Sequence, residues 1–201
     1  VDLMQAELAA GDHGDSALVN EPFLVDGASY DIKFAGLDSA GNRSVTITVT
    51  DVAFDNTPPK FEMTYPVAAI PVRNFDVGFT VSEQLHAGSI VWERSGGAED
   101  EVGTHTQILM ESELNAGEHP AAPLMSTPPA LAEGVTYSVY LKGRDKAGNE
   151  SISTPLRGIL YDATAPVFSD VTPSSDGFMN SSAISYNLSE AIEMGRIVWR
   201  R

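Results

Sequence analysis

The chain has 201 residues and a formal net charge of −16, from 12 Lys and Arg against 28 Asp and Glu. A surface this acidic repels phosphate backbones and anionic membranes, which argues against a nucleic-acid partner, and no apolar run approaches the ~18 residues that membrane insertion as a helix needs. The absence of cysteine excludes disulfides, thiolate metal sites and a cysteine nucleophile.

Residues 1–58 combine turn signals with one strand pattern. The stretch opens at Val1 without a methionine, as expected for a fragment or a mature product. "FAGLDSAGNR" (34–43) carries the pattern Gly-x-Asp-x-Ala-Gly-Asn, which is typical of a tight turn. Between 44 and 50, valine and isoleucine alternate with serine and threonine, which predicts a strand. The segment Asp55–Pro59 contains two prolines and is interpreted as a linker.

Residues 59–165 contain several short strand patterns separated by turn residues. Apolar and polar side chains alternate most clearly from Phe75 to Ser82, which predicts a strand with one buried face. "LKGRDKAGNE" (141–150) is expected to hold the turn of the last hairpin. The expected strands are 60–65, 75–82, 89–94, 137–141 and 151–160, and residues 111–116 are expected to form a short helical turn.

Residues 166–201 repeat the beginning of this pattern, and landmarks along the chain recur 107 positions apart, except that "LMQAELAAGDH" (3–13) matches "LMESELNAGEH" (109–119) at an offset of 106. A constant spacing across separate landmarks predicts tandem copies of one module. We therefore expect 1–58 to be the C-terminal part of one repeat, 59–165 a complete repeat, and 166–201 the N-terminal part of a further repeat. The matched landmarks are Asp38 with Asp145, the linker 55–59 with 162–166, Ser82-Glu83 with Ser189-Glu190, and Ile90-Val91-Trp92 with Ile197-Val198-Trp199.

Many short strands, close turns and about 107 residues per unit favour an antiparallel β-sandwich. "LAEGVTYSVYLKGRDKAGN" (131–149) resembles the Leu-x-x-Gly-x-x-Tyr-x-Val stretch of fibronectin type III domains and the Asp-x-x-Gly-Asn turn of bacterial immunoglobulin-like repeats in long surface proteins; its copy spans 24–42. The resemblance implies an all-β fold of immunoglobulin-like sandwich repeats in tandem. It also implies that Tyr30 and Tyr137 are corner tyrosines bonded to nearby backbone, and that Trp92 and Trp199 fill the space between sheets.

The Asp-x-Ala-Gly-Asn phrase has a structural interpretation and a functional one. Gly41 and Gly148 can adopt the left-handed conformation that such turns need, and Asp145 can accept backbone N–H groups within its turn. In a sandwich of this topology, the linker, the second-to-third loop and the last hairpin also meet at one end. Gathered carboxylates repel one another, and Ca²⁺, which takes 6–8 oxygen ligands, would relieve this. The candidate ligands are Asp55, Glu83, Asp145 and Asn149 at the first junction, and Asp162, Glu190 and a neighbouring module's Asp38 at the second.

The two partial repeats together lack only a counterpart of "SGGAEDEVGTHT" (95–106), a glycine-rich acidic loop. Each part alone is expected to expose an apolar face, for example at Ile184, Tyr186, Leu188 and Trp199. One hypothesis is that the front part of one chain pairs with the back part of an identical chain, head to tail, which would build a filament. The alternative is that the protein continues through this loop beyond the sequence at hand.

No motif of an enzyme is present: the sequence has no G-x-S-x-G, H-E-x-x-H or P-loop pattern. His13 and His119 are interpreted as exposed loop residues. We therefore expect a non-catalytic structural or adhesive repeat of a long bacterial protein, located at the cell surface or in an extracellular matrix, with neighbouring repeats as partners. The alternative is a carbohydrate- or protein-binding module accessory to a secreted enzyme, for which outward-facing Tyr140 is the only aromatic signal.

Overall fold

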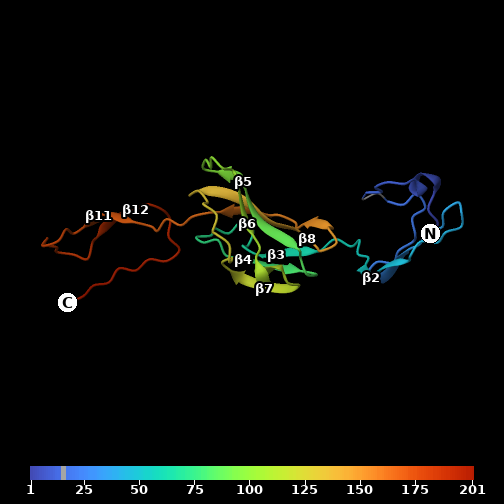
Figure 1. Cartoon of the computed structure of the whole chain (residues 1–201). Coiled ribbons are helices and arrows are strands. Elements are labelled where there is room, and N and C mark those ends of the chain that lie inside the picture. Colours follow the sequence, from blue (N-terminus) through green and yellow to red (C-terminus); the bar gives the residue numbers. More distant parts are fainter. Residues whose placement is uncertain (15–16) are drawn as a thin grey trace.

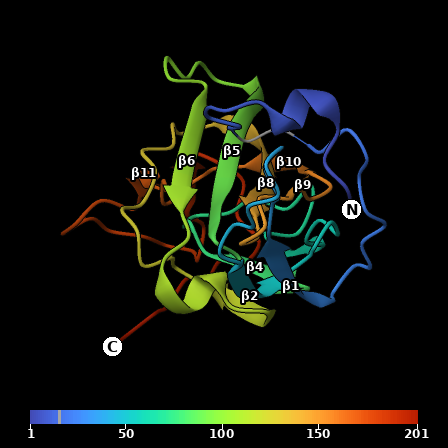
Figure 2. The same cartoon turned by 45° about the vertical axis from the view of Figure 1, so that its right-hand side comes forward.

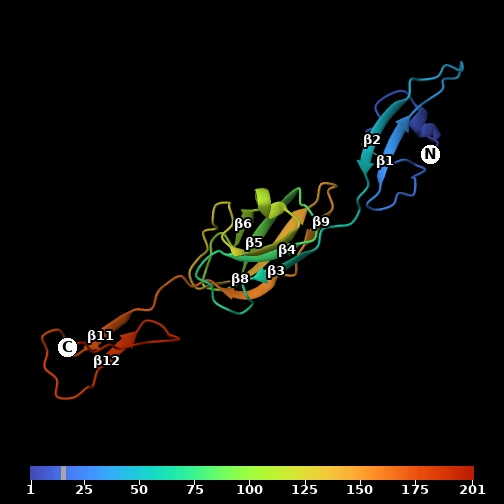
Figure 3. The same ribbon diagram turned by 90° about the horizontal axis from the view of Figure 1, so that it is seen from below.

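The computed structural model describes residues 1–14 and 17–201, and its strands form antiparallel sheets with only two short 3-10 helices. This confirms the all-β prediction and is consistent with a β-sandwich. Figures 1 and 3 show three successive parts: an N-terminal hairpin, a central body and a C-terminal hairpin, with the two hairpins at opposite ends. Among the described residues, no helix is long and apolar enough to cross a membrane.

The central body consists of two sheets. One has the strand order β3-β4-β7, and the other has the order β10-β8-β5-β6 with β9 paired to β8. β8 and β5 make the longest pairing, an antiparallel register from Ala87↔Arg144 to Gly97↔Val135. The strands are β3 (Phe61–Tyr65), β4 (Val77–Val81), β5 (Ala87–Gly97), β6 (Thr104–Ile108), β7 (Gly117–Ala122), β8 (Val135–Arg144), β9 (Glu150–Ile152) and β10 (Leu156–Leu160), and η2 (Glu111–Leu114) is the helical turn expected near 111–116.

The core of the central body draws on both sheets. Trp92 on β5 and Tyr137 on β8 are both fully buried, and their rings meet edge to face with centroids 6.2 Å apart. From the other sheet, Phe79 is buried on β4 and stacks on His119 with ring centroids 4.5 Å apart. Burying one such aromatic side chain contributes about 1.5–3 kcal/mol. The buried face predicted for 75–82 is present, because Val77, Phe79 and Val81 are buried while Thr80 is half-buried. The expectation that His119 is an exposed loop residue is wrong, because it lies half-buried on β7 against Phe79.

Two predicted segments differ from the structure. The last strand expected at 151–160 is two strands, β9 and β10, separated at Ser153–Pro155. Pro155 has no N–H to donate to a ladder, and at Ser153 the side-chain Oγ takes the place of a ladder acceptor by receiving the Leu141 N–H at 2.9 Å. The loop expected at 95–106 is only 98–103, since β5 and β6 pair up to Glu93↔Thr104 and β5 continues to Gly97.

Each end of the chain contributes one small two-stranded sheet. Trp199, expected to lie between sheets in a completed repeat and to be exposed in the partial one, is 60% exposed. The reason is that 191–201 form no strand and no second sheet lies against β11 and β12 among the described residues. The predicted exposed apolar face is confirmed for Ile184 and Tyr186, which are 36% and 45% exposed, while Leu188 is half-buried. These elements are η1 (Gln5–Leu8), β1 (Ser29–Phe34), β2 (Ile47–Ala53), β11 (Phe168–Thr172) and β12 (Ser185–Leu188).

Equivalent side-chain hydrogen bonds occur separately within the N-terminal part and within the central body, at positions that correspond in the sequence. The Tyr30 hydroxyl accepts the Val25 N–H at 2.7 Å, and the Tyr137 hydroxyl accepts the Ala132 N–H at 2.9 Å. Each tyrosine therefore bonds backbone five residues upstream, as expected for a corner tyrosine. In the same way, Glu7 accepts the N–H groups of Met4 and Val19, and Glu113 accepts those of Met110 and Met125.

Candidate metal centre

The turn between β8 and β9 holds the buried carboxylate of Asp145. This side chain is 2% exposed, and its Oδ1 accepts the N–H groups of Gly148 at 2.7 Å and Asn149 at 3.0 Å. The Asn149 amide donates to Asp145 Oδ2 at 2.8 Å. Burial alone would raise the pKa of Asp145, but the hydrogen bonds from Asn149 and Gly148 outweigh it and lower the pKa. Asp145 is therefore a carboxylate held rigidly at one end of the central body.

The equivalent turn in the N-terminal hairpin has the same bonds between its aspartate and asparagine but is exposed to solvent, and the further N–H that Asp38 accepts comes from Ala40 rather than from Gly41. Asp38 accepts the Asn42 backbone N–H at 2.8 Å and the Asn42 side-chain amide at 2.8 Å. Gly41 and Gly148 have φ angles of 88° and 97°, the left-handed region that glycine enters without a Cβ clash. The turn chemistry predicted from the repeated phrase is thus present in both places.

Three acidic side chains from distant parts of the sequence meet beside this turn. Asp55 is in the linker that enters β3, Glu83 follows β4, and Asp145 follows β8; one carboxylate oxygen from each lies within 4.8 Å of the other two. The Asn149 amide also donates to the Asp55 carbonyl oxygen at 3.0 Å, which ties the turn to the linker. Burial, and then the neighbouring carboxylates of Asp55, Asp145 and Asp26, raise the pKa of Glu83. The gathering expected from topology is therefore present at the first junction.

A fourth carboxylate, Asp26, belongs to this junction and was not among the predicted residues. Its Oδ2 accepts the Thr57 hydroxyl at 2.7 Å and its Oδ1 accepts the Asn56 N–H at 2.8 Å, so it fixes the linker to the N-terminal hairpin. The bond from Thr57, followed by that from Asn56, lowers the pKa of Asp26. Glu133, 107 positions later, likewise accepts the Ala163 N–H in the next linker at 3.0 Å, but no pattern in the sequence indicates either bond.

The second junction stays a prediction, because its third ligand was expected from a neighbouring module's Asp38. Asp162 accepts the Thr164 N–H within its own linker at 3.3 Å, and Glu190 follows β12. The chain's own Asp38 lies in the hairpin at the opposite end from β12 (Figure 3). Among the described residues, only the Asp55, Glu83 and Asp145 group brings three such side chains within metal-binding reach.

The first junction fits a hard divalent cation. Ca²⁺ binds oxygens at about 2.3–2.6 Å, so two oxygens on one ion lie at most ~5 Å apart, and the 4.8 Å spread of the three carboxylates falls within that limit. None of these carboxylates has a Lys, Arg or His partner, since the one ion pair of the described residues joins Asp100 and His105. A cation would supply the missing counter-charge between the linker and the central body.

That ion pair forms a second cluster, which sequence reasoning missed. Asp100 Oδ2 lies 2.8 Å from His105 Nε2 and accepts the Tyr137 hydroxyl at 2.8 Å, and the histidine and aspartate side chains are 7% and 5% exposed. The bond to His105 lowers the pKa of Asp100 to about 2, and burial raises the pKa of Tyr137 to about 12. The cluster fastens the β5–β6 loop to the corner tyrosine. In the sequence, Asp100 was hidden within the acidic run 99–101.

No protein-family model matches the chain, and a search of the curated proteins finds no match. The features of the chain that bear on function are the recurring spacing in its sequence, its recurring hydrogen bonds and the geometry of the first junction.

Proposed function

We propose that the chain is a stretch of tandem immunoglobulin-like repeats from a non-catalytic, extracellular or cell-surface structural protein of bacterial type. The observation that carries this proposal is the recurrence of side-chain hydrogen bonds one module apart. Tyr30 and Tyr137 each accept an N–H five residues upstream, and Asp38 and Asp145 each accept the backbone N–H and the side-chain amide of the asparagine four residues later. Unrelated segments have no reason to place the same donors on the same acceptors at one spacing. The proposed repeats are 1–58, 59–165 and 166–201, the first and last being partial.

The strand order of the central body supports the immunoglobulin-like assignment. Its first, second and fifth strands form one sheet, and its third, fourth, sixth, seventh and eighth form the other. A buried tryptophan on the third strand and a corner tyrosine on the sixth are features of that sandwich family. Such modules serve as spacers when the joints between them are stiff, and here the linker is anchored on both sides, by Asp26 to the preceding part and by Asn149 to the following one.

We further propose that Ca²⁺ binds between Asp55, Glu83 and Asp145 and stiffens this joint. Asn149 positions Asp145 through the bonds described above, and Asp26 adds negative charge beside Glu83. Extracellular modules bind calcium weakly, with dissociation constants of roughly 10⁻⁴–10⁻³ M.

Calcium titration of the full chain, followed by calorimetry and by melting temperature, tests the metal site. The wild-type chain is expected to bind with a dissociation constant of about 10⁻⁴–10⁻³ M and to melt at a higher temperature when calcium is bound. Glu83→Gln and Asp145→Asn should each remove both effects. Glu62→Gln, an exposed change of the same charge on β3, should leave them intact. Absence of any heat or melting shift at millimolar calcium would end the metal proposal without touching the repeat proposal.

The repeat proposal itself is tested by an experimental structure of the full chain. Superposing β1 and β2 with their turn on β8 to β10 should match the backbone, and β11 with β12 should match β3 with β4. Absence of the Val25 bond to Tyr30, or of the Asn42 bonds to Asp38, would contradict common descent of the parts.

A further inference from the structure

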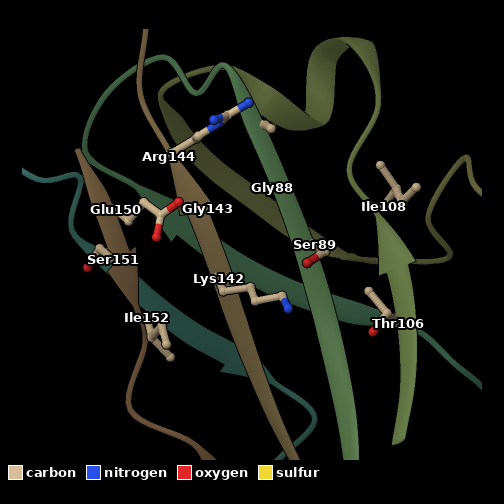
Figure 4. A pocket seen from close by; sticks show the side chains of 11 residues that line it. Gly88, Ser89, Thr106, Ile108, Lys142, Gly143, Arg144, Glu150, Ser151 and Ile152 are labelled. Carbon is tan, nitrogen blue, oxygen red and sulfur yellow. The ribbon is translucent and has the colours of Figure 1, made fainter. Parts of the chain in front are cut away.

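A trough of roughly 700 Å³ crosses the outer face of the larger sheet at the start of β5 (Figure 4). The registers of β9, β8, β5 and β6 place Ile152, Lys142, Ser89 and Ile108 side by side in one cross-strand row. Ser89 is 8% exposed and forms the floor, while Ile108 and Ile152 at the two rims are 64% and 65% exposed. The trough is therefore a small hollow with apolar edges, and none of its lining residues is aromatic.

Its charge is opposite to that of the rest of the chain. Lys142 and Arg144 line the trough from β8, and Glu150 is the only acidic lining residue. Neither cation makes an ion pair within the described residues, although the chain carries 28 acidic side chains against 12 basic ones. Two unpaired cations beside exposed isoleucines favour a ligand that combines carboxylates with a small apolar side chain.

The chain itself carries such a segment at the other end of β5. The tip of the β5–β6 hairpin, residues 98–103 ("AEDEVG"), has exposed Glu99 and Glu101 followed by Val102, which is 68% exposed. Asp100 is held inward by His105 and Tyr137, which fixes the shape of the tip. Figure 2 shows this tip extending beyond the rest of the central body. We propose that the acidic tip of one chain docks into the basic trough of a second copy.

The tip cannot reach the trough of its own chain. Ser89, opposite Lys142, and Gly97 at the base of the tip lie eight residues apart on one strand, about 26 Å at ~3.3 Å per residue. The contact therefore joins two chains, and it uses different surfaces on each partner, so it can be repeated from chain to chain. It involves neither the calcium junction nor the exposed terminal hairpins.

Zero-length carbodiimide cross-linking, which joins a lysine amine to a carboxylate in direct contact, tests the proposal. The full chain at about 0.15 M salt, where long-range repulsion is screened, should give dimers whose cross-linked peptides join Lys142 to Glu99 or Glu101. Lys142→Gln with Arg144→Gln should lower the dimer yield about fivefold or more. Lys146→Gln, an exposed charge change in the adjoining turn, should not.

A charge exchange keeps the test independent of folding. Chains carrying Glu99→Lys with Glu101→Lys, and chains carrying Lys142→Glu with Arg144→Glu, should each stay monomeric, and an equimolar mixture should regain the dimer. Failure of the mixture to dimerise, wild-type yields from the Lys142 and Arg144 variant, or cross-links only between other residues would each overturn the docking proposal. Chelator should leave the yield unchanged, which separates this contact from the calcium site.

Discussion

At the scale of single residues, the ionised Asp100 carboxylate, which holds Tyr137 by a hydrogen bond, makes the stability of the fold depend on pH in the acid range. Because its pKa is about 2 in the folded chain, below the ordinary value of 3.8, its contribution to stability is present above pH 4 and is lost as the pH falls toward 2. Asp100→Asn should lower the free energy of unfolding at pH 7 by roughly 1–3 kcal/mol and remove this acid-side loss. Urea unfolding at pH 7, 4 and 2.5 measures both, and Glu101→Gln in the same loop is the control.

Glu83 is expected to act in the opposite direction. Its pKa is raised in the folded chain by burial and by Asp55 and Asp145, so protonation of Glu83 favours folding and its destabilising effect grows as the pH rises toward neutrality. Without calcium at pH 7, Glu83→Gln should therefore melt a few degrees above the wild type. An unchanged or lower melting temperature would show that the gathered carboxylates do not repel one another significantly.

At the scale of elements, substitutions at two glycines at the base of the β5–β6 tip distinguish the cost of backbone strain from the cost of steric crowding. Gly97 and Gly103 have φ angles of 74° and 70°, but a Cβ on Gly97 would collide with the backbone of Gly134 and Thr136, whereas one on Gly103 would meet nothing within 4 Å. Gly103→Ala should cost about 1–2 kcal/mol through conformation alone, and Gly97→Ala should cost clearly more. Equal unfolding free energies for the two variants would contradict the close packing of β5 against β8.

The sequence predicted some elements well and others poorly, for identifiable reasons. β4 could be predicted because apolar Val77, Phe79 and Val81 occupy every second position of a strand with one buried face. β7 was missed because Glu118, His119 and Pro120 follow no apolar alternation, and their strand is set by pairing with β4. The length of the β5–β6 hairpin was also missed, since its outer part is polar and is held by cross-strand pairing rather than by burial.

For the whole molecule, the exposed C-terminal hairpin offers a direct test of head-to-tail pairing between partial repeats. Trp199 is 60% exposed and Trp92 is fully buried, so acrylamide, a neutral quencher, should reach only Trp199 in dilute solution. If partial repeats pair between chains, quenching of Trp199 should fall as the concentration rises, and sedimentation should show growing oligomers. Trp199→Phe provides the control in which only unquenched Trp92 remains. A monodisperse monomer with quenching independent of concentration rules out this pairing.

All ligands predicted for the first junction lie within this chain, whereas the second junction needs a ligand from a neighbouring module. Asp55, Glu83 and Asp145 were expected together from the proposed repeat spacing and sandwich topology, and their three loops do meet at one end of the central body. Asp26 could not be predicted, because its place at the junction depends on a side-chain bond from Thr57 that no turn pattern indicates. At the second junction, the third carboxylate would have to come from a module that the 201 residues do not contain.

The last strand of the central body also determines how the module would respond to tension. The stretch 69–72 runs parallel to β10 and its exit, through bonds from Ala69 to Arg157, from Val72 to Leu160 and from Asp162 to Val72. When the two linkers are pulled apart, parallel strands slide past each other, so these bonds must rupture together rather than one by one. Stretching single molecules should therefore show an abrupt force peak for the central body, which Val72→Pro, by removing one of the donors, should lower.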